Sequence, residues 1–151
     1  MLFDHDYKNY PELTNTQINE FGLSSPHQQI TEDFYATVTK VHDGDTITLK
    51  TGFRDFEFPL RFLNIDSKEL NEGGEAAREF VKGRIEGKEV QIKIDPNQRV
   101  GKYGRLLGNV FFGGMDVGEE ELRIGLAQPF EKRSEGKLPN LDKELSIKKW
   151  L

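Results

Sequence analysis

Short strands are the elements that the hydrophobic pattern of the chain predicts most clearly. Residues 34–41 are rich in β-branched and aromatic side chains with rough alternation, and residues 46–50 alternate cleanly. Asp43-Gly44 between them is a strong tight-turn signal, so the two segments are expected to pair as a hairpin. Three further strands are predicted over residues 56–65, 90–94 and 106–112.

Helical spacing of apolar residues marks three more stretches. The longest covers residues 72–84 and is closed by Gly87, and shorter helices are predicted over residues 119–124 and 140–150. Five strands with a helix between the third and the fourth are typical of a small closed barrel. We therefore expect an α+β, mainly β fold: a five-stranded OB-fold-type barrel with about three helices packed outside it.

Residues 1–32 differ in composition from the rest of the chain. They are rich in polar residues, with one short helix predicted from residue 15 or 16 to Phe21. They hold five acids and one base, a net charge of −4, whereas the other 21 acids and 20 bases leave −1. We expect an acidic N-terminal extension over 1–32 and a domain over 33–151. The extension is either a solvated tail or an arm that docks onto its own domain, a second copy or a larger assembly.

Composition excludes several kinds of chemistry and bears on location. The chain has no cysteine, which excludes disulfides, thiolate metal sites and a cysteine nucleophile, and its three histidines are too scattered for a zinc site. No apolar run approaches the roughly 20 residues that span a bilayer, and the first residues do not resemble a secretory signal. We therefore expect no membrane partner and a protein that is cytoplasmic or carried in an assembly such as a virion.

Three charged motifs follow one another along the domain. They are Asp43-Gly44-Asp45-Thr46, the segment from Leu60 to Glu69, and the segment from Gly101 to Arg105. Their carboxylates suit a hard divalent cation, and their arginines suit a phosphate. A pocket that brings both together is equipped for metal-assisted cleavage of a phosphodiester.

Each motif also has a purely structural interpretation. Asp45 can belong to an ordinary hairpin turn, and Arg105 can be a solvated loop arginine. Asp66 and Ser67 can simply begin a helix, with Ser67 as its N-cap. Strand alternation puts Arg61 and Asp66 on opposite faces unless a bulge or a strand end lies between them. Taken one at a time, the motifs leave both interpretations open.

Taken together, the motifs resemble the staphylococcal nuclease (thermonuclease) family. From about Phe34 to Trp150 the chain has, in the same order, an Asp-Gly-Asp-Thr hairpin, an Arg-hydrophobic-Ile-Asp-x-x-Glu segment, a helix with Glu-Ala, a Gly-Lys-x-Val strand, a Lys-Tyr-Gly-Arg loop and a Gly-Leu-Ala segment. Each motif is weak alone, but the ordered set spans most of the chain and is specific.

The resemblance implies a calcium-dependent nuclease that hydrolyses DNA or RNA with low sequence specificity and leaves 3′-phosphate ends. Asp45 and Asp66 would bind calcium through their carboxylates, and Ser67 through its backbone carbonyl. Oxygen ligands of this kind are those that calcium prefers. Glu69 would orient or deprotonate the attacking water.

The resemblance also implies roles in binding the substrate. Arg61 and Arg105 would bind the phosphate and stabilise the charge that develops on it in the transition state. Lys102 and Tyr103 would contact the nucleic acid, since an aromatic ring between cations suits a nucleotide.

The chain departs from the family pattern at three places. Ser67 stands where the family usually has threonine, and a backbone ligand tolerates that change. Lys68 replaces a common proline, so the turn before Glu69 is expected to be looser. The tyrosines expected after Gly125-Leu126-Ala127 are missing, so affinity or base preference is expected to differ.

Two other functions compete with an active nuclease. A structural or docking component of an assembly is supported by the acidic balance and the missing tyrosines. A non-catalytic nucleic-acid binder is disfavoured because a chain of net charge −5 lacks the basic groove that such binders use. Catalysis is favoured because a chain that had lost it would have no chemical reason to keep both arginines and Glu69.

Overall fold

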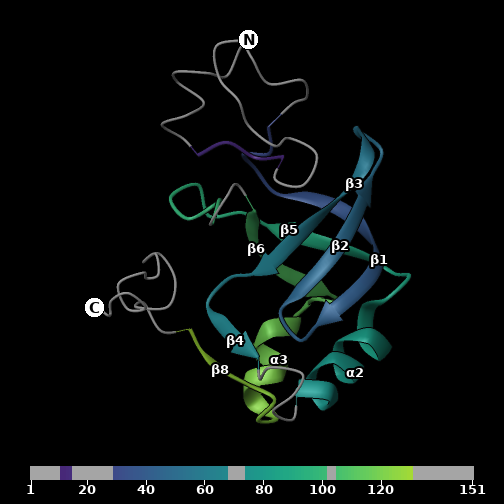
Figure 1. The fold of residues 1–151 in the computed structure, drawn as a ribbon, viewed down its shortest axis with the longest axis vertical. Helices are drawn as coiled ribbons and strands as arrows, with labels where there is room; N and C mark the ends of the chain where they lie inside the picture. The colour runs from purple at the N-terminus through teal and green to yellow at the C-terminus, as the bar shows by residue number, and fades with distance from the viewer. Residues whose placement is uncertain (1–10, 15–28, 68–73, 102–104, 131–151) are drawn as a thin grey trace.

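The structure, a computed structural model, describes residues 11–14, 29–67, 74–101 and 105–130 (Figure 1). The helices predicted from residue 15 or 16 to Phe21 and over 140–150 lie outside these ranges. No helix among the described residues is long and apolar enough to cross a membrane.

Five strands form a closed barrel, as the sequence predicts. They are β1 (Phe34–Asp43), β2 (Thr46–Thr51), β3 (Arg54–Phe62), β5 (Glu89–Lys93) and β6 (Leu106–Phe112). The order β3-β2-β1-β5-β6 is antiparallel throughout, and a parallel pairing of β3 with β6 closes the barrel. A short strand β7 (Met115–Asp116) pairs with the end of β6. The fold is therefore α+β and mainly β, with the topology of an OB-fold.

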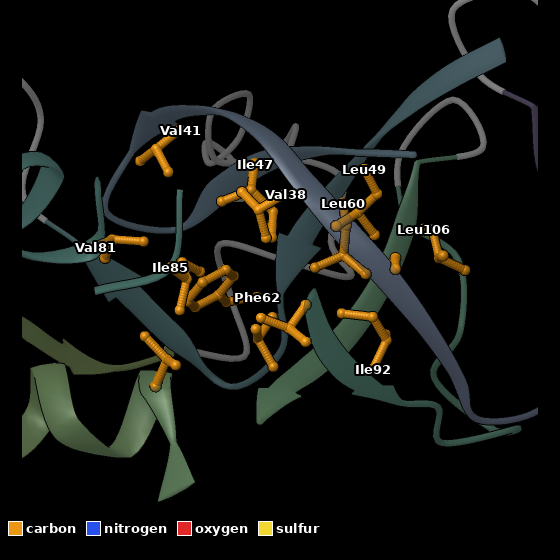
Figure 2. Packing of buried hydrophobic residues seen from close by; sticks show 14 of the residues in the cluster. Val38, Val41, Ile47, Leu49, Leu60, Phe62, Val81, Ile85, Ile92 and Leu106 are labelled. Atoms are coloured by element: carbon orange, nitrogen blue, oxygen red, sulfur yellow. The ribbon is translucent and has the colours of Figure 1, made fainter. Parts of the chain in front are cut away.

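Side chains from every strand fill the barrel. The fully buried ones include Val38, Leu49, Leu60, Ile92 and Leu106, one from each strand. Figure 2 shows these side chains pointing into the space between the strands, with Val81 and Ile85 among them. Burial of each such side chain contributes about 1.5–3 kcal/mol relative to exposure. This packed core fixes the positions of the strand ends that carry the candidate site residues.

Two helices pack outside the barrel in the described part of the chain. Helix α2 (Gly74–Ile85) lies near its predicted position, and Gly87, at φ 82°, ends it and donates its N–H to the carbonyl of Val38 at 2.7 Å. Helix α3 (Val117–Arg123) begins two residues earlier than predicted because Asp116 caps it, accepting the N–H of Glu119 at 3.1 Å.

The third strand ends earlier than the sequence predicts. β3 ends at Phe62 rather than Ile65, because the chain turns at Asn64, which has φ 71°. The next three residues form a separate strand, β4 (Ile65–Ser67), which pairs antiparallel with β8 (Ala127–Pro129). The sequence analysis predicted neither β4 nor β8 as a separate strand. Asp66 thus belongs to a small second sheet beside the barrel.

Candidate active site

The tight turn between β1 and β2 carries Asp45. Asp43 pairs with Thr46, so Gly44 and Asp45 form the turn as predicted. The Asp45 carboxylate is buried and fixed from both sides. Its Oδ2 accepts the backbone N–H of Ser67 at 3.0 Å, and its Oδ1 accepts the hydroxyl of Thr46 at 3.1 Å. The turn is therefore bonded directly to β4.

Gly44 lets this turn approach its neighbours closely. A Cβ atom at Gly44 would lie 2.6 Å from the Cβ of Ser67, 2.7 Å from the Cβ of Ala77 and 2.8 Å from Oε1 of Glu121. All three distances are shorter than a side chain tolerates. The sequence signal at this glycine was a turn, but what the structure requires here is the absence of a side chain.

Arg61 joins the turn to β4. Its Nη2 donates to Oδ1 of Asp66 at 2.6 Å and lies 3.3 Å from Oδ2 of Asp45. Its Nη1 donates to the backbone carbonyls of Phe62 at 3.1 Å and Ile65 at 3.3 Å. One guanidinium thus bonds two carboxylates and both sides of the turn that separates β3 from β4.

Phe130 lies against the same arginine. Its ring centroid is 5.5 Å from Cζ of Arg61, and its backbone N–H donates to the carbonyl of Asn64 at 2.9 Å. Phe130 lies in the stretch that lacks the family's tyrosines, and the sequence analysis did not single it out. Its position beside Arg61 follows from the pairing of β8 with β4, which no local pattern indicates.

Arg105 immediately precedes β6, and β6 pairs with β3, the strand that carries Arg61. Leu107 is the register partner of Arg61 in the parallel pairing, and Arg105 comes two residues before Leu107. Because side chains alternate along a strand, extending β6 back by two residues would put Arg105 on the same face of the sheet as Arg61. Of the other predicted site residues, Glu69, Lys102 and Tyr103 lie outside the described residues.

The paired carboxylates of the turn differ in their ionisation. Burial, together with the hydrogen bond and the charge of Asp45, raises the pKa of Asp43 to about 6. Burial would also raise the pKa of Asp45, but the charge of Arg61 and hydrogen bonds from Asp43, Ser67 and Thr46 lower it overall. Asp45 is therefore ionised at neutral pH.

Glu121 is a buried carboxyl that the sequence analysis missed. It is fully buried on α3, and neither of its carboxyl oxygens has a hydrogen-bond partner among the described residues. Burial and the charges of Asp45, Asp43 and Asp116 raise its pKa to about 9. One signal was available, because Glu121 lies four residues after the apolar Val117 and therefore on the same helix face.

Asp45, Asp66 and Ser67 offer oxygen atoms that suit a hard cation. Both carboxylates come within 3.3 Å of one nitrogen of Arg61, so their oxygens converge on a single positive group. No three histidine, cysteine or acidic side chains in the described ranges group closely enough to hold a metal by themselves. The donors fit calcium in chemistry, with carbonyl or water oxygens needed to complete its shell.

The closed barrel with a cluster of charges beside β4 is consistent with the nuclease family that the sequence resembles. The family model for staphylococcal nuclease homologues matches residues 59–147, and the chain belongs to that family. It is 28% identical over 146 residues to endonuclease YncB of Bacillus subtilis (strain 168), covering 83% of this chain and 68% of YncB.

A second relative comes from the same organism. The SPbeta prophage-derived endonuclease YokF is 33% identical over 99 residues, covering 61% of this chain and 33% of YokF. The match therefore spans about a third of the length of YokF.

Proposed function

We propose that this nuclease-family domain is a calcium-dependent endonuclease that hydrolyses DNA or RNA with low sequence specificity and leaves 3′-phosphate ends. The observation that carries the proposal is the convergence of Asp45 and Asp66 on one nitrogen of Arg61. Membership of the staphylococcal nuclease family and two relatives named as endonucleases support it.

Asp45, Asp66 and the carbonyl of Ser67 would hold the cation. A bound divalent cation would stabilise negative charge on the phosphate and make an attacking water more acidic. The lowered pKa of Asp45 keeps its carboxylate ionised at neutral pH, as cation binding requires. The amide of Ser67 and the hydroxyl of Thr46 hold that carboxylate in one orientation.

Arg61 and Arg105 would bind the scissile phosphate. Arg61 balances the charges of Asp45 and Asp66 in this structure, and a cation shared by those carboxylates would free its Nη2 for a phosphate oxygen. A guanidinium presents donors in a planar fork that matches two oxygens at once. Arg105 immediately precedes the neighbouring strand β6, and from there it would place a second cation beside the charge that develops in the transition state.

Glu69 would act as the general base, with Lys102 and Tyr103 on the substrate. A carboxylate within hydrogen-bond reach of the attacking water can orient it and accept its proton. These three roles rest on the family motif alone. Contacts to phosphate carry no base information, which fits low sequence specificity.

Cleavage of labelled single-stranded DNA and RNA tests the proposal. Wild type should cleave at least one of the two with calcium and stop on chelation, and Glu69→Gln should lose about 10²–10⁴-fold in rate. Glu79→Gln, on an exposed position of α2, is the matched control and should cleave like wild type. Products should be extended by a 3′-end polymerase only after phosphatase treatment. A folded wild type that does not cleave, or that cleaves equally in chelator, would refute the proposal.

A further inference from the structure

Glu12 of the N-terminal extension is buried against the domain between two arginines. Its side chain is fully buried, with Oε2 2.7 Å from Nη2 of Arg54 and Oε1 2.9 Å from Nη2 of Arg99. Arg54 begins β3, and Arg99 lies in the connection between β5 and β6. One carboxylate therefore links two parts of the barrel that are far apart in sequence.

Arg99 bonds to two separate pieces of the extension. Its Nε donates to the carbonyl of Ile30 at 2.8 Å, and its Nη1 donates to the carbonyl of Leu13 at 2.6 Å. The two pieces are also bonded to each other. The N–H of Ile30 donates to Oε1 of Glu12 at 2.9 Å, and Nε2 of Gln29 donates to the carbonyl of Pro11 at 3.0 Å. Segments 11–14 and 29–30 thus form a strap closed around one guanidinium.

The backbone of Arg99 begins the segment that leads to Arg105. The carbonyl of Arg99 accepts the N–H of Leu107 at 2.9 Å, and the carbonyl of Arg105 accepts the N–H of Gly101 at 2.7 Å. An isolated bridge joins Val100 to Leu106 between these two bonds. Arg99 and Arg105 are therefore connected by a short backbone ladder.

We propose that the strap formed by residues 11–14 and 29–30 positions Arg105 for the phosphate, with Glu12 as the positioning residue that acts through Arg99. The proposal rests on the proposed role of Arg105. Without the carboxylate, Arg54 and Arg99 would each lose the buried ion pair that Glu12 makes with it, and the strap would hold Arg99 less firmly. The ladder at Gly101 and Leu107 would then loosen, although the barrel core would remain.

This role differs from docking onto another molecule. The side chains of Glu12 and Leu13 are fully buried against their own domain, and Ile30 is nearly so. These residues are therefore not available to a partner. A strap that stabilises the barrel as a whole is the remaining alternative, and the experiment separates it from a strap that acts on Arg105.

Amide hydrogen exchange in the full chain tests the coupling without any activity. Glu12→Gln should speed exchange at Gly101 and Leu107 at least tenfold more than at Val38, whose N–H bonds to Lys88 in the barrel. Val81→Ala is the control, because it should lower global stability without touching the strap. Its exchange should not speed up more at Gly101 and Leu107 than at Val38. If Glu12→Gln does not fold, Leu13→Ala loosens the strap through its packing while the carboxylate stays in place. The proposal is wrong if Glu12→Gln speeds exchange by the same factor at Gly101, Leu107 and Val38, or does not change it at all.

Cleavage kinetics then connect the strap to Arg105. Glu12→Gln should lower kcat/KM at least fivefold in the wild-type background and have no further effect when combined with Arg105→Lys. An equal loss in both backgrounds would mean that the strap does not act through Arg105. If wild type shows no cleavage, the proposed nuclease function fails, while the exchange experiment still decides whether the strap controls the ladder.

Discussion

Nη2 of Arg61 lies 2.6 Å from Oδ1 of Asp66, although strand alternation alone would place the two side chains on opposite faces. The left-handed turn at Asn64, with φ 71°, redirects the chain between β3 and β4 and brings them together. Arg61 holds the turn in place through the carbonyls of Phe62 and Ile65. The turn therefore creates the site as much as the charged residues do.

Asn64→Val should weaken both the fold and the site. A β-branched residue at positive φ is strained, at a cost of about 1–2 kcal/mol. Asn64→Gly, which adopts this conformation freely, is the matched control and should keep near-normal calcium-dependent cleavage. Urea unfolding and cleavage rates of the two variants test this, and a stable, active Asn64→Val would show that the turn is not required.

Gly44→Ala should displace the turn that carries Asp45. The added Cβ would lie 2.6 Å from the Cβ of Ser67, so we expect a loss of about 1–3 kcal/mol in unfolding free energy and a sharp fall in cleavage. Gly52→Ala is the control, because a Cβ there meets nothing within 4 Å. Similar behaviour of the two variants would contradict the close approach at Gly44.

Arg61→Lys should lose most activity while keeping its charge. An ammonium cannot bond two carboxylates and two carbonyls from one planar group, so we expect a fall in kcat of about 10²–10³-fold. Arg78→Lys, on the partly exposed face of α2, is the control. A kcat within a few-fold of wild type would mean that Arg61 contributes only its charge.

Glu121 should make stability fall as pH rises. Its pKa is about 9 in the folded protein against 4.5 as the ordinary value, so the folded state holds one more proton than the unfolded state between these values. Its contribution is complete below about pH 4.5 and is lost toward pH 9, at up to about 1.4 kcal/mol per pH unit.

Glu121→Gln isolates this effect. Unfolding free energies are measured in chelator from pH 5 to 8. The unfolding free energy of the variant should increase relative to that of wild type as pH rises. Glu119→Gln, at an exposed position of α3, should run parallel to wild type. Parallel curves for Glu121→Gln would mean that the buried carboxyl ionises normally.

The barrel could be predicted because its strands and α2 carry strong local patterns. Alternation in β2, the turn at Gly44 and the apolar face that includes Val81 each specify an element without reference to distant residues. The end of β3 could not be predicted, because the apolar Phe62, Leu63 and Ile65 continue the strand-like pattern on both sides of Asn64. Only the left-handed conformation of Asn64 ends the strand.

The sequence indicates candidate site residues but not how they lie relative to one another. The motif order indicated Asp45, Arg61 and Asp66, but not that one nitrogen joins them. Phe130 reaches the site through the pairing of β8 with β4, and Glu12 reaches Arg99 across 87 positions of sequence. Contacts of that range leave no local pattern. Docking of the extension onto its own domain was one of the alternatives, but the partners of Glu12 and the ring beside Arg61 were missed.

Single-turnover cleavage of 5′-labelled single-stranded DNA over a calcium titration, for wild type and Asp66→Asn, tests the central claim most directly. Wild type should cleave with a saturable dependence on calcium. Asp66→Asn should fold normally and need at least about 10-fold more calcium for the same rate. A folded wild type that stays inactive at every calcium concentration, or an Asp66→Asn curve that overlays wild type, would contradict a cation-dependent nuclease centred on Asp45, Arg61 and Asp66.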